Sequence, residues 1–373
     1  MSACNSGGDS GSSNPSQAMN ISVTPNSSGV CSNVNAPCVS VTICDTNNNN
    51  CSTVNDILVD TGSYGLRVFS SAISQNTINS LIPQTTNQKY VAECVSYGDG
   101  SQNWGGVYNS NVQLSSDATA NNIPIQIIDA SFQTPPSACA NAASDPTSFG
   151  YNGILGVGVY VQDGGQYFSC FDNSCTPYNL PTSNQVANPI AFLPNNNNGL
   201  TISFNSVSNN GSSNVTGTLN FGVNTNSNNT ISVANKYNAT YSSGLPVFNA
   251  TYNNSNYSAF LDTGTNTLSL SNSGINTCSS PYTSWLCPSS TQTLTIGNFN
   301  SNNAIVNTTI NIANTINLLN SGNTAYNNLG TTIPSGFGGQ FIDYGLPFFF
   351  GKTVQIVFNG SQSNLGTGPF WAW

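Results

Sequence analysis

Histidine is absent from the 373-residue sequence. Its absence excludes serine and cysteine hydrolases that depend on a histidine base, and it excludes histidine-ligated zinc sites. Glutamate is almost absent as well, because Glu93 is the only one. If the protein uses carboxylates for catalysis, that chemistry therefore falls mainly to its aspartates.

Charge of both signs is scarce, and positive charge is the scarcer. The chain has four lysines and arginines against thirteen acidic residues, a net charge of −9. Nucleic-acid binding needs a basic patch that neutralises phosphates, so we expect no nucleic-acid partner. A chain with so few cations also gains little positive charge when its carboxylates are protonated, which suits an acidic environment. Low-charge surfaces occur in neutral environments too.

No apolar run approaches the ~20 residues that a membrane-spanning helix needs. Eleven cysteines in a polar chain indicate an oxidising compartment, and the odd number leaves one thiol over. Ser2-Ala3-Cys4 resembles the end of a bacterial lipobox, which predicts lipidation at Cys4; the alternative is an unstructured thiol. Residues 1–20, rich in Gly and Ser, are predicted to be a flexible linker. We expect an exported outer-membrane or cell-surface lipoprotein, or a secreted protein, held at a membrane only through Cys4.

The spacing of the other cysteines predicts three local disulfides: Cys44–Cys51, Cys170–Cys175 and Cys278–Cys287. Four cysteines are left for two further bonds, and their pairing stays open: Cys31, Cys38, Cys94 and Cys139. No pair of cysteines has zinc-site spacing, so we expect neither a metal nor another cofactor.

Alternating and short apolar runs predict a chain made mainly of strands. Val39–Ile43 alternates as a half-buried strand does, and Ile57–Val59 is a short apolar strand. Helical periodicity is weak, with two candidates for short helices at Ser71–Ile82 and Asn311–Leu319.

One heptapeptide pattern occurs twice. Ile57–Ser63 (ILVDTGS) reappears as Ala259–Thr265 (AFLDTGT), each an apolar strand that ends in Asp-Thr-Gly. The repeat predicts two similar lobes, residues 21–200 and 201–373. A single Asp-Thr-Gly would be explained by turn formation alone, because Asp and Gly favour turns. Two copies in the same context favour a functional role.

If the two turns meet, the carboxyl groups of Asp60 and Asp262 come close together. Like charges at such a distance cannot both ionise, so the pair holds one proton over an acidic range. One member then acts as a base while the other acts as an acid, as amide hydrolysis by water requires. The proton belongs to the pair and is assigned to neither aspartate.

These motifs resemble the pepsin family of aspartic proteases, and four further segments match in family order across most of residues 35–360. The segments that carry the resemblance are Tyr97–Ser101 (the flap), Asn152–Val157, Thr218–Gly222 and Gly345–Phe358. The chain is also similar to a bacterial subgroup of exported, lipoprotein-like members of unassigned function. This resemblance implies an all-β, bilobal pepsin-like fold with pseudo-two-fold symmetry and few short helices.

The resemblance also implies roles for individual residues. Asp60 and Asp262 would hold the catalytic water, and Thr61 and Thr263 would lock the two loops together. The other residues of the two loops would support the pair: Gly62, Ser63, Gly264 and Thr265. The substrate-binding flap would consist of Tyr97, Gly98 and Asp99.

Arg67 departs from the family pattern, because pepsins usually carry there a tryptophan that braces the flap tyrosine. An arginine close to the pair would favour ionised carboxylates and shift the acidic limb of the pH profile downward. Trp104 is a possible substitute for the brace, although its ordinary role is packing within the hairpin.

The expected function is an aspartic endopeptidase that acts as a monomer on extended polypeptides. Two alternatives stay open. One is a catalytically silent pepsin-fold surface lipoprotein that binds polypeptide or glycan, and the other is a structural or adhesive lipoprotein. Two intact aspartates argue against the first, because binding alone does not need both.

Overall fold

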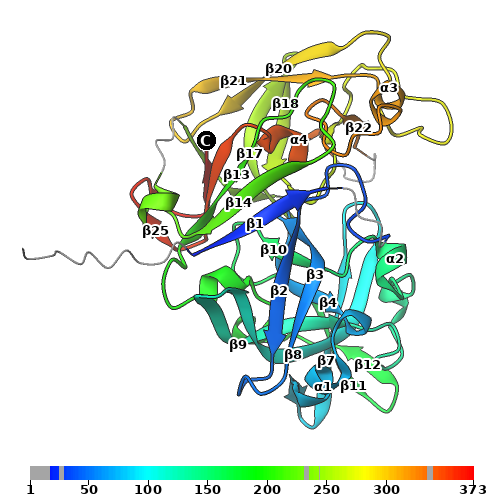
Figure 1. Cartoon of the computed structure of the whole chain (residues 1–373), viewed down its shortest axis with the longest axis vertical. Helices are drawn as coiled ribbons and strands as arrows, with labels where there is room; N and C mark the ends of the chain where they lie inside the picture. Colours follow the sequence, from blue (N-terminus) through cyan, green and yellow to red (C-terminus); the bar gives the residue numbers. More distant parts are fainter. Residues whose placement is uncertain (1–16, 25–28, 231–234, 243, 334–338) are drawn as a thin grey trace, which may run out of the picture.

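The computed structural model describes residues 17–24, 29–230, 235–242, 244–333 and 339–373. The described chain is mostly β and forms two lobes, a six-stranded barrel and a half-barrel. In Figure 1 the first half of the chain, blue to green, occupies one lobe, and most of the second half occupies the other. The predicted lipidation site, Cys4, and most of the predicted linker lie outside the described residues. The last residues of that linker, 18–20, belong to a strand, so the linker prediction is corrected there.

The strands of the first lobe belong to a large mixed sheet. They are β2 (Cys38–Cys44), β3 (Cys51–Asp60), β4 (Tyr64–Phe69), β5 (Ile82–Pro83), β6 (Thr85–Thr86), β7 (Lys89–Ser96), β8 (Gln102–Ser115), β9 (Ala118–Ile128), β10 (Gly153–Val157), β11 (Gln166–Phe171) and β12 (Ser174–Pro177). Their sequences alternate as expected: in β2, Val39, Val41 and Ile43 are buried, whereas Ser40 is exposed.

The same sheet continues into strands that join the two halves of the chain. They are β1 (Ala18–Val23), β13 (Gly199–Phe204), β14 (Val215–Phe221), β15 (Lys236–Asn238), β24 (Thr353–Val357) and β27 (Phe370–Ala372). β1 pairs with β14 along its full length, and β13 pairs with β24 near the C-terminus. Figure 1 shows β1, β13 and β14 between the two lobes. The predicted division at residue 200/201 thus falls inside β13, within the sheet that joins the lobes.

A second sheet forms the other lobe. Its strands are β16 (Thr240–Ser242), β17 (Leu245–Tyr252), β18 (Ser255–Leu261), β19 (Leu268–Leu270), β20 (Gln292–Phe299), β21 (Ile305–Ile312), β22 (Gly330–Thr332) and β23 (Phe341–Tyr344). A separate small hairpin pairs β25 (Gln362–Ser363) with β26 (Gly366–Thr367).

Both lobes hold their Asp-Thr-Gly strand in the same way. β10 runs parallel to β3 and antiparallel to β4, with Leu155 opposite Val59. β23 likewise runs parallel to β18 and antiparallel to β19, with Tyr344 opposite Leu261. The internal repeat seen in the sequence is therefore also a repeat of strand pairing.

The described helices are short: α1 (Gln75–Ser80), α2 (Pro146–Phe149), α3 (Thr315–Leu319) and α4 (Leu346–Phe349). α1 lies within the predicted Ser71–Ile82, where the Ser74 side chain accepts a hydrogen bond from Thr77 N. The second prediction began too early, because residues 311–312 complete β21 and α3 begins only at Thr315.

Five disulfides join the ten cysteines that the structure describes. The three predicted local bonds are confirmed, and the remaining four cysteines pair as Cys31–Cys38 and Cys94–Cys139. This number of disulfides indicates an extracytoplasmic protein. Within the part of the chain that the structure describes, no helix is long and apolar enough to span a membrane.

Candidate active site

Asp60 ends the buried strand β3, and the turn after it supplies donors to its carboxyl group. Gly62 N donates to Asp60 Oδ1 over 2.7 Å, and Ser63 Oγ donates to Asp60 Oδ2 over 2.5 Å. The Asp60 side chain is buried. Hydrogen bonds to both oxygens fix the carboxyl orientation at the rim of the lobe.

Asp262 follows β18 and is held by an equivalent set of contacts. Gly264 N donates to Asp262 Oδ1 over 2.7 Å, and Thr265 Oγ1 donates to Asp262 Oδ2 over 2.9 Å. The two loops thus repeat each other contact by contact.

The two threonines of these loops bond across the junction between the lobes. Thr61 Oγ1 donates to Leu261 O over 3.1 Å and accepts from Thr263 N over 3.0 Å. Thr263 Oγ1 donates to Val59 O over 2.7 Å and accepts from Thr61 N over 3.1 Å. Both side chains are buried, so these four bonds are shielded from water and fix one loop against the other.

The glycines of the loops leave no room for a side chain. A Cβ added to Gly62 would lie 2.6 Å from Asp262 Cγ, and one added to Gly264 would lie 2.8 Å from Asp60 Cγ. Each glycine therefore faces the aspartate of the opposite lobe, and only its missing side chain permits the approach. The structure brings together the eight residues predicted to form and support the pair.

Burial raises the pKa of Asp262 well above its usual value, and the negative charge of Asp60 raises it further. A hydrogen bond between the two carboxyl groups contributes in the same direction. This behaviour is expected of two carboxyls that share one proton.

The predicted flap lies at the tip of the β7–β8 hairpin. Gly100 N donates to Tyr97 O over 3.0 Å, and Asp99 Oδ1 accepts from Ser101 N over 2.9 Å, which shapes the turn. Gly98 and Asp99 are exposed, whereas Tyr97 is half-buried and packs against Phe149. Burial raises the pKa of Tyr97, and the charge of Asp60 contributes, so the tyrosine lies within electrostatic reach of the pair.

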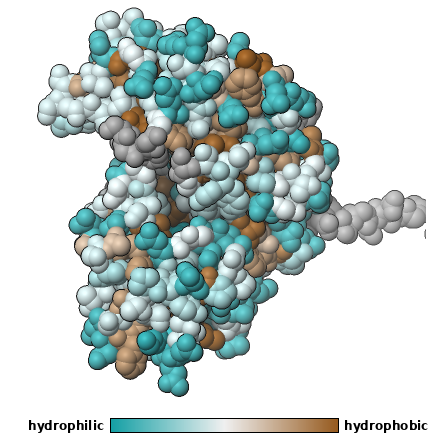
Figure 2. All heavy atoms as spheres, turned by 180° about the vertical axis from the view of Figure 1, so that it is seen from behind, coloured by the Kyte–Doolittle hydropathy of each residue, from teal (hydrophilic) through white to brown (hydrophobic). Residues whose placement is uncertain are grey.

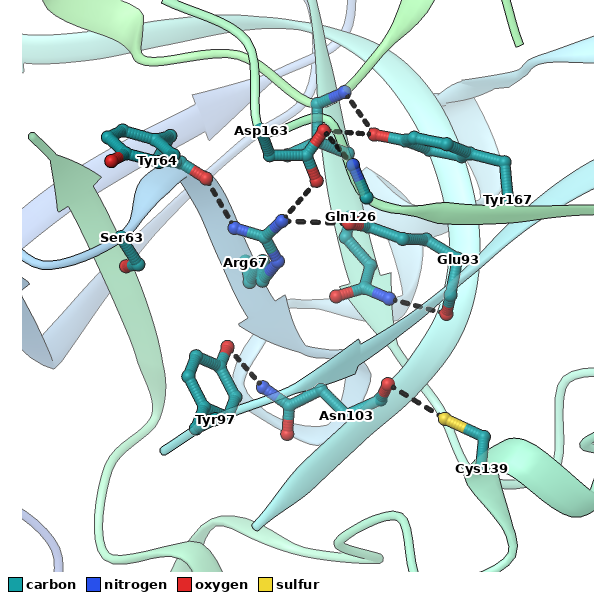
Figure 3. Close-up of polar contacts among 12 residues, drawn as sticks. Ser63, Tyr64, Arg67, Glu93, Tyr97, Asn103, Gln126, Cys139, Asp163 and Tyr167 are labelled. Atoms are coloured by element: carbon teal, nitrogen blue, oxygen red, sulfur yellow. Dashed lines mark hydrogen bonds and ion pairs between the residues drawn. The ribbon is translucent and has the colours of Figure 1, made fainter. Parts of the chain in front are cut away.

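Arg67 does not serve the aspartate pair directly as the sequence predicted. Its guanidinium donates to Glu93 Oε1 over 2.8 Å and to Asp163 Oδ2 over 2.5 Å, and it also bonds to Tyr64 O. Figure 3 shows the Arg67 guanidinium at the centre of these groups, with dashed lines to the Tyr64 carbonyl, Asp163 and Glu93. The positive charge of Arg67 is therefore matched by two carboxyls other than the pair. The predicted downward shift of the acidic limb of the pH–activity profile thus has no support.

Trp104 packs within the hairpin region and does not replace the brace. Its ring is fully buried against Phe168, and its Nε1 donates to Phe132 O over 2.7 Å. Tyr97 is instead held by Asn103 Nδ2, which donates to its hydroxyl over 3.0 Å (Figure 3).

Asp343 is a third carboxyl beside the pair, and sequence reasoning missed it. It lies on β23 opposite Phe260 and is 7% exposed. Burial raises its pKa well above the usual value, a hydrogen bond to Thr265 lowers it in part, and Asp60 raises it again. The only signal in the sequence was a charged residue two positions before Gly345, inside an otherwise apolar strand.

The surface between the lobes is hollowed. Figure 2 shows a notch in the outline of the molecule between the lobes, with hydrophobic atoms visible in its depth. A notch of this kind, with two carboxyls at the junction of the lobes, suits the binding of an extended chain.

Fold and site together define a two-lobed, mostly β protein with paired aspartates where the lobes join. The chain belongs to the family described as protein of unknown function (DUF3443), whose model matches residues 13–373. No curated protein matches the chain.

Proposed function

We propose that the protein is a pepsin-like aspartic endopeptidase that hydrolyses peptide bonds of extended polypeptides. The observation that carries the proposal is the hydrogen bond between the carboxyl groups of Asp60 and Asp262. Each carboxyl is also supported by a glycine N–H and a hydroxyl from its own loop. A protein that only binds or adheres has no need for two carboxyls side by side, one buried and one half-buried, which cost free energy to hold.

In the proposed reaction the pair holds one proton and one water. The ionised carboxylate accepts a proton from the water as its oxygen attacks the carbonyl carbon, and the protonated carboxyl donates to the carbonyl oxygen. The tetrahedral intermediate then loses the amine, which takes a proton from the carboxyl that the water protonated as the C–N bond breaks, while one hydroxyl of the intermediate returns its proton to the other carboxylate. The starting state is restored without a covalent bond to the protein.

The surroundings of the pair support a polypeptide substrate. The exposed flap tip with Gly98 and Asp99 offers backbone groups to an extended chain, and Tyr97 would cover that chain above the pair. The disulfides fit action outside the cytoplasm, and lipidation at Cys4 would tether the enzyme there.

Cleavage of casein between ~pH 3 and pH 7 tests the proposal, because a carboxyl pair that shares a proton works in acid. The parent protein is compared with Asp60→Asn and Asp262→Asn, and with Asp172→Asn as a control in the exposed turn between β11 and β12. We expect the parent and the control to cut, and both site variants to lose at least ~10³-fold in rate. A folded parent that cuts at no pH would contradict the proposal and favour a binding protein.

A further inference from the structure

Each lobe places an apolar cluster beside its aspartate loop. In the first lobe, Leu58 and Ile154 are buried in one cluster, and Tyr97 and Phe149 pack against it. In the second lobe, Phe260 clusters with Val247 and Phe341, with Leu245 and Ile333 packed against them. The two clusters flank the pair and are suited to the side chains on either side of a scissile bond.

The register of the strands makes Ile154 and Asp343 equivalent. Ile154 lies opposite Leu58, two residues before Asp60, and Asp343 lies opposite Phe260, two residues before Asp262. The apolar lining of the first lobe thus has a carboxyl group in its place in the second. The repeat is broken at a position beside the pair.

The carboxyl of Asp343 has a free hydrogen-bonding atom although it is more than nine-tenths buried. Its Oδ1 has no hydrogen-bond partner. The Asp343 carboxyl also forms a hydrogen bond with the side chain of Thr265, which itself donates to Asp262. A buried acceptor left unpaired costs roughly 1–3 kcal/mol. Such a cost is offset if a bound molecule supplies the missing donor.

No cation of the described chain fills this role. The ion pairs among the described residues are those of Arg67 with Glu93 and Asp163. Lys236 and Lys352 donate to backbone carbonyls elsewhere. Nor is any group of three or more Cys, Asp or Glu in the described part of the chain arranged so that it could hold a metal ion.

We propose that Asp343 makes the subsite in the second lobe selective for a lysine or arginine side chain of the substrate. The aliphatic stem would lie along Phe260 and Phe341, and the cationic end would donate to the free Oδ1 of Asp343. This assignment rests on the proposed function, because it takes the bound polypeptide to be a substrate. The preference for a cationic side chain is a separate property of the same surface and can be measured by binding alone.

Matched fluorogenic peptides test the assignment. They share one sequence and carry lysine or norleucine, which has the stem without the ammonium, on one side of the scissile bond and then on the other. Parent, Asp343→Asn, Asp343→Ile and the control Asp172→Asn are compared by the ratio of kcat/KM for lysine over norleucine. A charged hydrogen bond predicts a ratio of at least ~10 in the parent and control. We expect the ratio to fall about tenfold in Asp343→Asn and to invert in Asp343→Ile.

A ratio that stays within about twofold of the parent value in Asp343→Asn would overturn the proposal. An equal loss for both peptides would also overturn it, because Asp343 would then act on the pair instead of the substrate side chain.

Equilibrium binding of the same peptides to Asp60→Asn, with and without Asp343→Asn, separates this proposal from the proposed function. A lysine preference that disappears with Asp343→Asn supports the subsite even if the parent cuts nothing. Equal binding of both peptides, or none, refutes it while leaving the casein result to decide the proposed function.

Discussion

At the scale of single residues, two threonine hydroxyls set the distance between the aspartates. Thr61 and Thr263 each donate to a carbonyl and accept from an N–H of the opposite loop. Both are buried, so a loop that lost its partner would leave two backbone groups unpaired and out of reach of water.

Thr61→Val keeps the shape of the side chain and removes only the hydroxyl. Because Leu261 O and Thr263 N would lose their partner, we expect the free energy of unfolding to fall by about 2–3 kcal/mol. Thr61→Ser retains the hydroxyl and should lose less than about 1 kcal/mol. Urea unfolding with the disulfides intact measures both variants. Equal losses for Val and Ser would show that packing, and not the hydrogen bonds, holds the loops together.

The sequence was sufficient to predict the aspartate pair and its supporting residues, because the two loops carry the same short motif. It was not sufficient for Asp343, whose position beside Asp262 depends on β23 running parallel to β18 across some 80 residues of intervening chain. A lone aspartate in a strand gives no sign of the strand that it will face.

At the scale of elements, a buried charge cluster joins the flap strand to the first aspartate loop. Arg67 on β4 contacts Glu93 on β7 and Asp163 in the loop after β10. Burial raises the pKa of Glu93 well above its usual value; Arg67 lowers it in part, and Asp163 raises it further. A Glu93 that keeps its proton adds no negative charge to this cluster.

This assignment predicts unequal effects of two substitutions. Glu93→Gln keeps a neutral group of the same size, so it should cost no more than about 1 kcal/mol of stability at pH 5. Arg67→Met leaves an uncompensated buried carboxyl and should cost about 3–5 kcal/mol. Thermal and urea unfolding measure both. A loss for Glu93→Gln as large as that for Arg67→Met would place the negative charge on Glu93 instead.

The strands and three disulfides were predictable because alternation and cysteine spacing are local signals. The partners of Arg67 were not, since they lie 26 and 96 positions away and meet it only through strand pairing. The helix predicted over 311–319 began too early because cross-strand pairing with β20 extends β21 to Ile312.

At the scale of the whole molecule, the charge composition favours stability at acidic pH. With four basic residues, the protein gains little repulsion when its carboxyls are protonated. Among the described residues, three carboxyls have raised pKa values, namely those of Glu93, Asp262 and Asp343. Two others have lowered pKa values because they accept backbone hydrogen bonds: that of Asp145, and that of Asp45, which falls to about 2.

The sign of each shift predicts the pH dependence of stability. Groups with raised pKa values hold protons that the unfolded chain releases near 3.8 to 4.5, so their stabilisation is complete below that range and is lost as the pH rises. Groups with lowered values stabilise above 3.8, and this contribution is lost as the pH falls toward about 2. We expect the melting temperature to be highest between about pH 3 and 5.

A thermal-melt series from pH 2 to pH 8 checks this expectation. In Glu93→Gln one of the raised groups no longer titrates, so the loss of stability from pH 5 to pH 7 should be shallower than in the parent. A melting temperature that rises steadily to pH 7 would contradict the assignment of the buried protons.

In the proposed reaction Asp60 and Asp262 direct a water molecule at a peptide bond. Digestion of casein near pH 4 in H₂¹⁸O, followed by mass spectrometry of the fragments, tests it most directly, with Asp60→Asn and Asp172→Asn digested in parallel. We expect one ¹⁸O in each new C-terminal carboxyl group from the parent and the control, and no new fragments from Asp60→Asn. Fragments that persist in Asp60→Asn, or a folded parent that produces none, would contradict it.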